Sequence, residues 1–266
     1  MDTKVTALVL AGRRSGVLDP LAARAGVNQK AVVPINGKPL IEHTLSAVAA
    51  CDRIGAIRVV AHESAEIEAI PLVASLKAEG RLTFTEAKFN LVDSVASGTE
   101  GADFPVLITT ADNTLVTPEG YAEFIDKALA VKADAAAALA RKEDVQAADP
   151  RGQAKFYEFK DGGFSNCNMY WIGNAGALDA AEIFRNGGQF VKFPSRIAKA
   201  FGLINLARFY FGIGDRDAIF AKVSKRFGYS IHGITMSNGE YAIDVDNERT
   251  YEVSEKLLAK RDAASL

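Results

Sequence analysis

One lysine and three aspartates in this 266-residue sequence have the types and spacing that phosphate chemistry uses. Lys30 lies in the segment that follows a glycine turn at Gly12, Asp112 follows the apolar run FPVLITTA, and Asp244 and Asp246 lie in AIDVDNE near the C-terminus. Mg²⁺ prefers one or two carboxylates together with water and phosphate oxygens. A nearby lysine would neutralise charge when a phosphate is attacked. The combination predicts a magnesium–triphosphate site.

Each aspartate also has a purely structural interpretation. Asp112 is of a type that forms turns, and Asp246 is suitably placed to cap a final helix at Asn247-Glu248. What favours chemistry is their combination at the ends of strands.

The first loop is a second candidate for phosphate binding. The apolar run VTALVL ends before Ala11 and Gly12, and Arg13 and Arg14 follow. Backbone N–H groups at a small-residue turn form a concave cradle for anionic oxygen, and a guanidinium can hold phosphate with two hydrogen bonds. The alternative is an ordinary solvated loop that happens to contain two arginines.

The elements that position these residues alternate along the chain between strands and helices. We expect strands at 5–10, 56–61, 81–85, 104–109, 135–141 and 229–235, helices at 40–51, 66–76, 91–97, 117–131 and up to 261, and an antiparallel hairpin from 155–159 and 168–172. This order predicts βαβ units and an α/β fold with a mixed, mostly parallel sheet. Right-handed crossovers would place the carboxyl ends of the parallel strands at one edge, so that Gly12 and Asp112 face the same cleft.

Composition excludes several classes of protein. With 48% hydrophobic residues, 24% charged residues and a net charge of −2, the chain reads as an ordinary globular protein, which we expect to form one domain over 1–266. No apolar run approaches the roughly 18–20 residues of a membrane span, and the chain enters its first strand directly, so we expect neither a membrane helix nor a signal peptide. Cys51 and Cys167 do not make a disulfide framework, which favours the cytoplasm. The three histidines are too scattered for metal-ligand spacing.

Residues 185–230 carry nine lysines and arginines against two aspartates, a net charge of +7, with phenylalanines and tyrosines interleaved. We expect a helical insertion over about 185–228. One interpretation is a cap whose aromatic side chains pack on the sheet. The other is a face for an anionic partner, either a phosphorylated acceptor or the surface of an anionic membrane. Nucleic acid is not expected, because the whole chain is slightly acidic and no nucleic-acid-binding motif is present.

Four segments carry a family resemblance: LVLAG, the stretch AVVPINGKPLIEHTL after Lys30, VLITTADNTLVTPE, and AIDVDNERTYE. They resemble the MobA-like nucleotidyltransferases, which are related to the molybdenum-cofactor guanylyltransferases, the sugar-phosphate nucleotidyltransferases and the cytidylyltransferases. The resemblance covers residues 5–141 and returns at 229–253. It implies a three-layer α/β/α sandwich of the nucleotide-diphospho-sugar transferase type, similar to the glycosyltransferase-A fold.

The resemblance also implies roles for individual residues. Lys30 would contact the phosphoryl centre, and Asp112 and Asp246 would be the first and second ligands of Mg²⁺ or Mn²⁺, with Asp244 as the alternative to Asp246. The residues implied to contact the nucleotide are Leu10, Ala11, Gly12, Asp93, Ser94 and Ala111, with Asp93 and Ser94 bordering the base. The sequence departs from the family after Asp112, where Asn113 begins Asn-Thr-Leu in place of the more usual Asp-x-Pro-Leu.

Two further points concern the acceptor and the first loop. Asn168 is at the position where pyrophosphorylases hold the acceptor. The family's loop is richer in glycine, whereas here Arg-Arg-Ser separates Gly12 from Gly16. This leaves open whether Arg13 or Arg14 takes the place of the family's catalytic arginine.

The reaction implied is NTP plus a phosphorylated small-molecule acceptor giving NDP-acceptor and pyrophosphate, with GTP or CTP as the expected NTP. One alternative is a nucleotide-sugar-dependent glycosyltransferase, although that class would show Asp-x-Asp at the strand end. Another is a nucleotide-binding regulatory protein with a degenerate site. A Rossmann dehydrogenase is not expected, because the glycines after the first strand do not form Gly-x-Gly-x-x-Gly.

Overall fold

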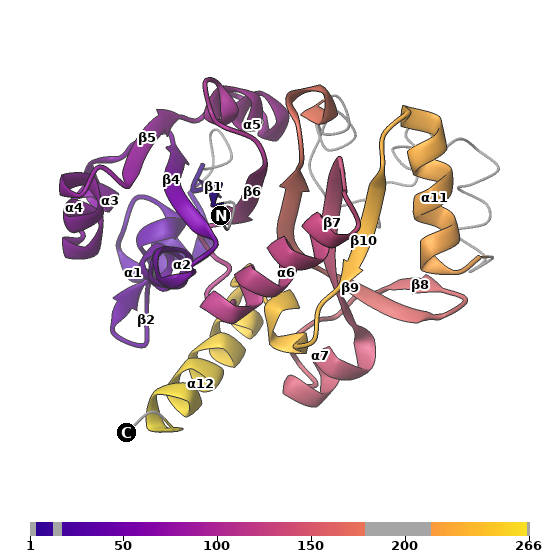
Figure 1. Ribbon diagram of the computed structural model, residues 1–266. Helices are drawn as coiled ribbons and strands as arrows, with labels where there is room; N and C mark the ends of the chain where they lie inside the picture. Colours follow the sequence, from indigo (N-terminus) through magenta and orange to yellow (C-terminus); the bar gives the residue numbers. More distant parts are fainter. Residues whose placement is uncertain (1–3, 13–17, 179–213, 265–266) are drawn as a thin grey trace.

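The computed structural model describes residues 4–12, 18–178 and 214–264. The predictions for Arg13, Arg14 and residues 185–213 lie outside these ranges. Within them, eight strands form one sheet in the order β10-β7-β9-β6-β1-β4-β5, with β8 paired to β9 (Figure 1). The strands are β1 (Val5–Leu10), β4 (Ile54–Ala61), β5 (Leu82–Glu86), β6 (Val106–Thr110), β7 (Ala135–Arg141), β8 (Tyr157–Phe159), β9 (Gly162–Ile172) and β10 (Ile231–Thr235).

The sheet is mixed and mostly parallel, as predicted. Strands β4, β1 and β6 run parallel to one another, as do β4 and β5, and β7 and β10. Strand β9 is antiparallel to both of its neighbours, β6 and β7. All strands of this sheet except β9 therefore run in the same direction, and the carboxyl ends of β1, β4, β5, β6, β7 and β10 lie at one edge. Ala111 N donates to Leu10 O at 2.9 Å, so the ends of β1 and β6 lie directly side by side.

Helices cover both faces of the sheet and make a three-layer α/β/α sandwich (Figure 1). The helices are α1 (Pro20–Ala25), α2 (Leu40–Ala50), α3 (Ala65–Glu68), α4 (Pro71–Ala78), α5 (Leu91–Thr99), α6 (Pro118–Ala130), α7 (Lys142–Ala148), α11 (Arg216–Phe227) and α12 (Glu248–Ala264). Side chains alternate between the faces because a strand has a period of two. Val9 of β1 belongs to the larger core under α2, α6 and α12, and Leu8 to the smaller core under α5 and α11.

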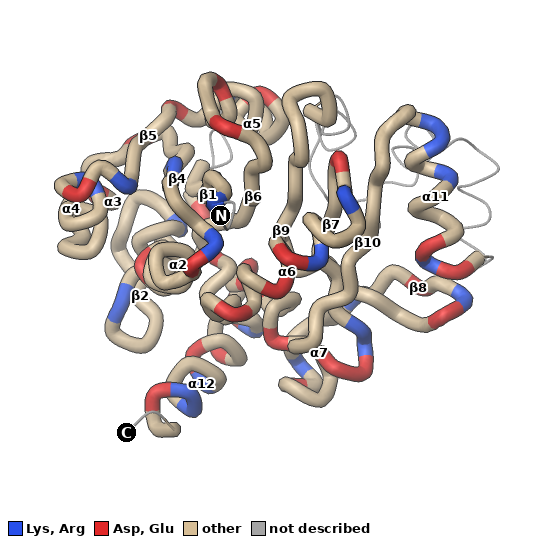
Figure 2. The backbone as a smooth tube through the Cα atoms, in the orientation of Figure 1, with Lys and Arg blue, Asp and Glu red and all other residues tan. Residues whose placement is uncertain are grey.

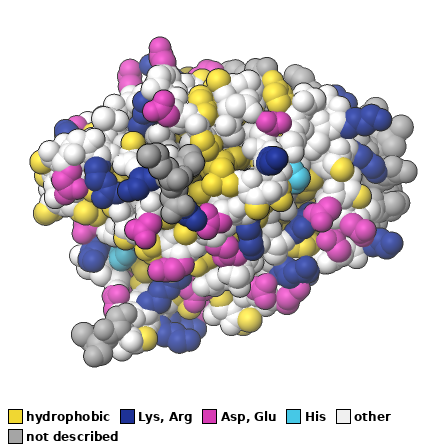
Figure 3. Space-filling model, viewed as in Figure 1, with side chains coloured by type: hydrophobic (Ala, Val, Ile, Leu, Met, Phe, Trp, Pro, Cys, Tyr) yellow, Lys and Arg dark blue, Asp and Glu magenta, His cyan; other side chains and the backbone are white. Residues whose placement is uncertain are grey.

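Charge is distributed as expected for such a sandwich. Charged residues lie mainly on helices and connecting loops (Figure 2). On the face drawn in Figure 3, the acidic and basic side chains of the described residues are intermixed. No helix in the described part of the chain is both long enough and apolar enough to cross a membrane.

Several predicted elements need correction. The single helix expected over 66–76 is wrong: α3 and α4 are separate, because Pro71 lacks an N–H and starts a new helix. The hairpin has different limits, since β8 is only Tyr157–Phe159 and β9 already begins at Gly162. Phe159 pairs with Gly162, which leaves Lys160 and Asp161 as the turn. Helices α1 and α7 were not predicted.

The last part of the expected basic insertion is α11, a helix as predicted. Its apolar side chains pack on the sheet: Val223 is buried, and a Cβ added at Gly233 of β10 would lie 2.4 Å from the Phe220 ring. For the described part of this segment, the structure supports the cap interpretation.

Candidate active site

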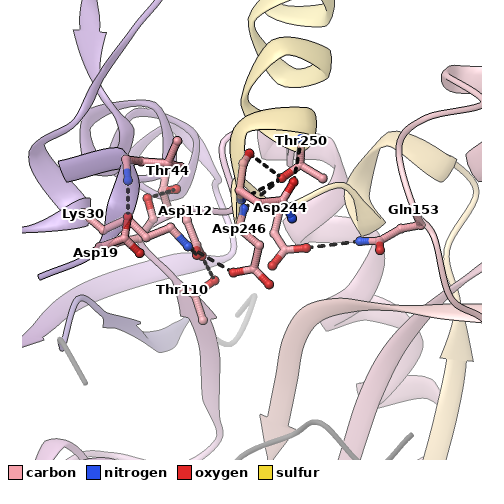
Figure 4. Close-up of polar contacts among 12 residues, drawn as sticks. Asp19, Lys30, Thr44, Thr110, Asp112, Gln153, Asp244, Asp246 and Thr250 are labelled. Atoms are coloured by element: carbon pink, nitrogen blue, oxygen red, sulfur yellow. Dashed lines mark hydrogen bonds and ion pairs between the residues drawn. The ribbon is translucent and has the colours of Figure 1, made fainter. Parts of the chain in front are cut away.

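Lys30 lies between two carboxylates that come from distant parts of the chain (Figure 4). Its Nζ is 2.5 Å from Asp112 Oδ2 and 3.1 Å from Asp246 Oδ1. Lys30 begins the 3₁₀ turn η1 (Lys30–Val32), Asp112 follows β6, and Asp246 precedes α12. The structure therefore brings together three of the residues that the sequence singled out, at the edge where the parallel strands end.

Asp112 is held by the end of β6 and by the loop that precedes α12. Thr110 Oγ1 donates to Asp112 Oδ1 at 2.5 Å, and Val245 N donates to the main-chain oxygen of Asp112 at 3.1 Å. Thr44 Oγ1 of α2 donates to Ala111 O at 3.3 Å, which fixes the preceding peptide. The Asp112 carboxylate is thus held in place beside the chain segment that carries the other two aspartates.

The loop between the 3₁₀ turn η5 (Gly239–Ala242) and α12 supplies Asp244 and Asp246. Gln153 Nε2 donates to Asp244 Oδ1 at 3.2 Å and to Ala242 O at 2.6 Å. Thr250 Oγ1 accepts from Asp246 N at 2.9 Å. Asn247, not Asp246, provides the side-chain cap of α12, because Asn247 Oδ1 accepts from Thr250 N at 3.3 Å. The Asp246 carboxylate is therefore left to face Lys30.

A second set of contacts ties the Lys30 segment to α12. The Arg24 guanidinium of α1 lies over the Tyr251 ring, 4.5 Å from its centroid, and pairs with Glu248. Tyr251 Oη donates to Pro34 O at 2.8 Å. These contacts hold the turn that carries Lys30 against the helix that follows Asp246.

The electrostatics of the cluster follow from burial and from the closeness of like charges. Burial disfavours the Lys30 ammonium, but Asp112 and Asp246 outweigh it, so the pKa of Lys30 lies above its ordinary value. Burial, then repulsion from Asp246 and Asp112, raises the pKa of the Asp244 carboxyl to about 8. A cation bound among the three carboxylates would relieve this repulsion.

The same three aspartates meet the requirements of a divalent-cation site. One carboxylate oxygen from each of Asp112, Asp244 and Asp246 lies within 4.8 Å of the others. Oxygen ligands of this kind suit Mg²⁺ and Mn²⁺, which also take water and phosphate oxygens. The donor set therefore fits the metal that the sequence predicted, and Asp244 and Asp246 both lie in it.

The Gly12 turn lies at the same sheet edge, on the side of β4 and β5. A Cβ added at Gly12 would be 3.3 Å from Ala87 Cβ and 3.5 Å from His62 Cε1, so the glycine allows these loops to meet closely. Ala11 and Ala111 are buried at the ends of β1 and β6, and Leu10 is half-buried. The Gly12 turn and Asp112 therefore follow two neighbouring strands, β1 and β6, at one edge of the sheet, as predicted from the strand order.

Asp93 and Ser94 lie in the first turn of α5 and hydrogen-bond locally. Asn90 caps this helix, with its Oδ1 accepting from Asp93 N at 2.9 Å, while its Nδ2 donates to Asp93 Oδ2 at 2.6 Å. Ser94 is buried and its Oγ accepts from Lys88 N at 2.9 Å. The described contacts make these two residues supports of the loop after β5; their predicted role beside a base stays a prediction.

Asn168 lies on β9 at a register shift of the β7–β9 pairing, with a positive φ of 51°. Asn tolerates this left-handed conformation better than most residues, and bulges of this kind are common beside active sites. Asn166 Nδ2 donates to Asn168 Oδ1 at 3.0 Å and to Tyr170 Oη at 2.5 Å. These polar side chains form a row on β9; binding of an acceptor there stays a prediction.

Sequence reasoning missed three residues that hold the aspartates in place, Thr110, Gln153 and Thr250. It also missed Asn113, whose Nδ2 donates to Cys167 O of β9 and so ties the turn after β6 to that strand. Thr250 had a signal, because Asn247 and Thr250 have the spacing of a helix cap. Asn113 was noted only as a departure from the family. Gln153 lies in a connecting segment, and nothing in its local sequence links it to Asp244.

Comparison with known proteins places the fold and the family. Residues 7–202 match the family model of the MobA-like NTP transferase domain. A hypothetical transferase from Thermus thermophilus is similar in structure, with a TM-score of 0.77 and 24% identity over 94% of this chain and 100% of that one. No protein with a curated description matches the sequence.

Two further solved structures share the fold at lower similarity. One is 4-diphosphocytidyl-2C-methyl-D-erythritol synthase from Anaerococcus prevotii, with a TM-score of 0.57 and 12% identity over 97% of both chains. The other is CMP:2-keto-3-deoxy-manno-octonic acid synthetase complexed with CTP, with a TM-score of 0.57 and 13% identity over 97% of this chain and 100% of that one. At these identities the likeness shows the fold alone. The family match covers most of the chain, however, and the chain therefore belongs to the MobA-like NTP transferase family.

Proposed function

We propose that this protein transfers a nucleoside monophosphate from an NTP to a phosphorylated small molecule, releasing pyrophosphate in a Mg²⁺-dependent reaction. The observation that carries the proposal is the position of Lys30, 2.5 Å from Asp112 and 3.1 Å from Asp246, in an NTP transferase domain whose Gly12 turn follows the strand next to the one that Asp112 follows. A nucleoside triphosphate needs positive charge beside its phosphates, and in this proposal the Lys30 ammonium supplies it.

In the proposed reaction, an oxygen of the acceptor phosphate attacks the α-phosphorus of the NTP in line with the leaving group. A new P–O bond forms, the bond from the α-phosphorus to the bridging oxygen breaks, and pyrophosphate leaves with the electron pair. Lys30 stays charged because its pKa is raised, so its ammonium can stabilise negative charge that develops on the α-phosphate. The site requires no general base, because a phosphate monoester is largely ionised near pH 7.

Asp112 and Asp246, with Asp244 beside them, are the residues that would hold the metal. When bound, Mg²⁺ supplies neutralisation of the charge on the phosphate oxygens. Thr110, Gln153 and the helix cap at Thr250 keep the carboxylates in position before any ligand arrives. Such preorganisation avoids the cost of rearranging charged groups during the reaction.

GTP and CTP are the nucleotides that we propose to test first, CTP also because one neighbour of similar fold was solved in complex with it. We place the acceptor on the β9 side, near Asn168, since the Gly12 turn lies on the other side of Asp112. The free, buried cysteines Cys51 and Cys167 are consistent with a cytoplasmic location. A role of residues 185–230 at an anionic membrane stays a prediction, as does acceptor binding by that segment.

The decisive experiment is a pyrophosphate-release screen of the four NTPs against pooled phosphorylated acceptors, with Mg²⁺ and with EDTA. We expect Mg²⁺-dependent pyrophosphate release with one NTP and one pool. A glycosyltransferase would instead release nucleoside diphosphate from a nucleotide sugar, and a degenerate regulatory protein would bind NTP without turnover. Either result would contradict the proposal.

A further inference from the structure

Glu66 of α3 accepts hydrogen bonds from the two residues that precede Lys30. Its Oε1 accepts from Asn28 Nδ2 at 3.0 Å, and its Oε2 accepts from Gln29 Nε2 at 3.1 Å. The Gln29 amide nitrogen also donates to the main-chain oxygen of Glu63 at 3.3 Å, so each of its two N–H groups has an acceptor. One carboxylate therefore holds both residues of the segment that leads into the 3₁₀ turn of Lys30.

Gln29 is the buried member of this group. Only 7% of Gln29 is exposed, whereas Asn28 is at the surface. The Gln29 backbone is extended, with φ −148° and ψ 146°, and its side chain does not cap the turn that Lys30 begins. Successive side chains of an extended chain point to opposite sides. The Gln29 amide accordingly reaches Glu66, while the Lys30 ammonium reaches Asp112. Fixing the Gln29 amide therefore also fixes the direction in which the Lys30 side chain leaves the main chain.

The loop that leads from β4 to Glu66 also contacts the Gly12 turn. His62 opens this loop directly after β4, and a Cβ added at Gly12 would be 3.5 Å from His62 Cε1. At its other end the loop holds Gln29. The loop therefore relates the position of Lys30 to that of the Gly12 turn, which is the proposed cradle for phosphate.

We infer that Glu66 is a positioning residue for Lys30 and acts on it through Gln29. The consequence for turnover rests on the proposed function, in which Lys30 stabilises negative charge on the α-phosphate. A displacement of about 1 Å at a reacting group can cost on the order of 100-fold in rate, even when the change is made far from the chemistry. Glu66 itself contacts neither NTP nor metal in this proposal. Its removal should therefore impair turnover more than NTP binding.

The test removes each end of the hydrogen bond between Glu66 and Gln29. Glu66→Ala removes the acceptor, and Gln29→Met removes the donor while it keeps the length of a buried side chain. Because the two residues act as one unit, the double variant should lose no more than the more affected single variant. Glu68→Ala is the matched control, since Glu68 lies on the same short helix and its carboxylate pairs with Ser64 and Lys77 instead. Circular dichroism first establishes that each variant is folded.

The first measurement follows Lys30 itself and needs no substrate. Metal-free protein is treated with an amine-acetylating reagent, and peptide mass spectrometry compares the rate at Lys30 with the rate at exposed Lys132. An ammonium held between two carboxylates is protected from the reagent, so we expect slow acetylation of Lys30 in the wild type and in Glu68→Ala. Acetylation should be several-fold faster in Glu66→Ala and Gln29→Met. Wild-type protection of Lys30 in both folded variants would overturn the inference.

Steady-state kinetics provide the second measurement, with the NTP and acceptor that the pyrophosphate screen identifies. We expect kcat to fall about 10- to 100-fold in Glu66→Ala and Gln29→Met with little change in the KM for NTP, and Glu68→Ala to keep the wild-type kcat. An unchanged kcat in both variants would also overturn the inference, and it would leave the proposed function intact. If the wild-type chain releases no pyrophosphate, the proposed function fails, whereas the acetylation rates still decide whether Glu66 holds Lys30 in place.

Discussion

Asn113 Nδ2 donates a hydrogen bond of 2.9 Å to the main-chain oxygen of Cys167, and this bond joins the turn that carries Asp112 to the register shift that carries Asn168. The Asn113 side chain is completely buried, and the same amide nitrogen also reaches Thr109 Oγ1 at 3.2 Å. The proposed metal ligand Asp112 and the proposed acceptor residue Asn168 are therefore linked through one buried amide. We propose that Asn113 positions both.

Asn113→Ala should lower both stability and turnover. Removing the amide leaves the buried Cys167 carbonyl without this partner, which costs about 1–3 kcal/mol of unfolding free energy. If Asn113 also sets the relation between Asp112 and Asn168, kcat should fall further than the stability change alone explains at temperatures where the variant is fully folded. Urea unfolding and steady-state kinetics together measure this. Normal kcat in a folded but destabilised variant would make Asn113 a purely structural residue.

Asp112→Asn and Asp246→Asn should each remove most activity and leave the fold intact. Both changes keep the shape of the side chain and take away a charge that would hold the metal, so we expect kcat to fall on the order of 100-fold or more. Mn²⁺ titration should show weaker metal binding in both. The Asp112 variant is the stricter test, because Asp244 lies beside Asp246 and is the alternative to it as the second ligand. If Asp246→Asn keeps its kcat while Asp244→Asn loses most of it, the second metal ligand is Asp244 and not Asp246.

Lys30→Met should impair turnover more than NTP binding. Methionine has a similar length, but it cannot neutralise charge on the α-phosphate, so the loss should appear mainly in kcat. Removing the ammonium also leaves Asp112 and Asp246 without their ion-pair partner in the metal-free protein. The thermal midpoint without Mg²⁺ should therefore change more than the midpoint with Mg²⁺. A rise in the KM for NTP with an unchanged kcat would show that Lys30 only binds the nucleotide.

The sequence was informative where the chemistry follows strand ends. Asp112 was predictable because an apolar run of strand length stops just before it, and Lys30 because a lysine in the segment after a glycine turn can neutralise charge when a phosphate is attacked. Because parallel strands end at one edge of a sheet, the segments that follow β1 and β6 were expected to meet there. The family resemblance then supplied the roles, which no single motif could have given.

Other features depend on contacts between distant segments, which local patterns do not contain. Gln153 holds Asp244 across 91 positions of sequence, and no local feature marks it. The split between α3 and α4 was visible at Pro71, but the apolar spacing on both sides of it suggested one continuous helix. Helix α1 has only six residues, too few for a clear apolar period. The extent of β9 depends on pairing with β6 and β7, so its sequence alone did not show where it begins.

The last prediction concerns pH, and it follows from the raised pKa of Asp244. In the folded protein this pKa is about 8, against 3.8 for an unperturbed aspartate. Between these values the folded state binds more protons than the unfolded state, so the free energy of unfolding falls as pH rises. The slope from this one group is at most about 1.4 kcal/mol per pH unit, and partial access of solvent to the carboxyl makes it smaller.

Metal-free protein should therefore have a lower thermal midpoint at pH 8.5 than at pH 6. Asp244→Asn should flatten this dependence, whereas Asp103→Asn, at an exposed position, should leave it unchanged. Because a cation binds the ionised carboxylate, the gain in midpoint from Mg²⁺ should be larger at pH 8.5 than at pH 6. Thermal unfolding from pH 5.5 to 9, in EDTA and in Mg²⁺, tests all three points. A slope in Asp244→Asn equal to that of the wild type would assign the pH dependence to another group.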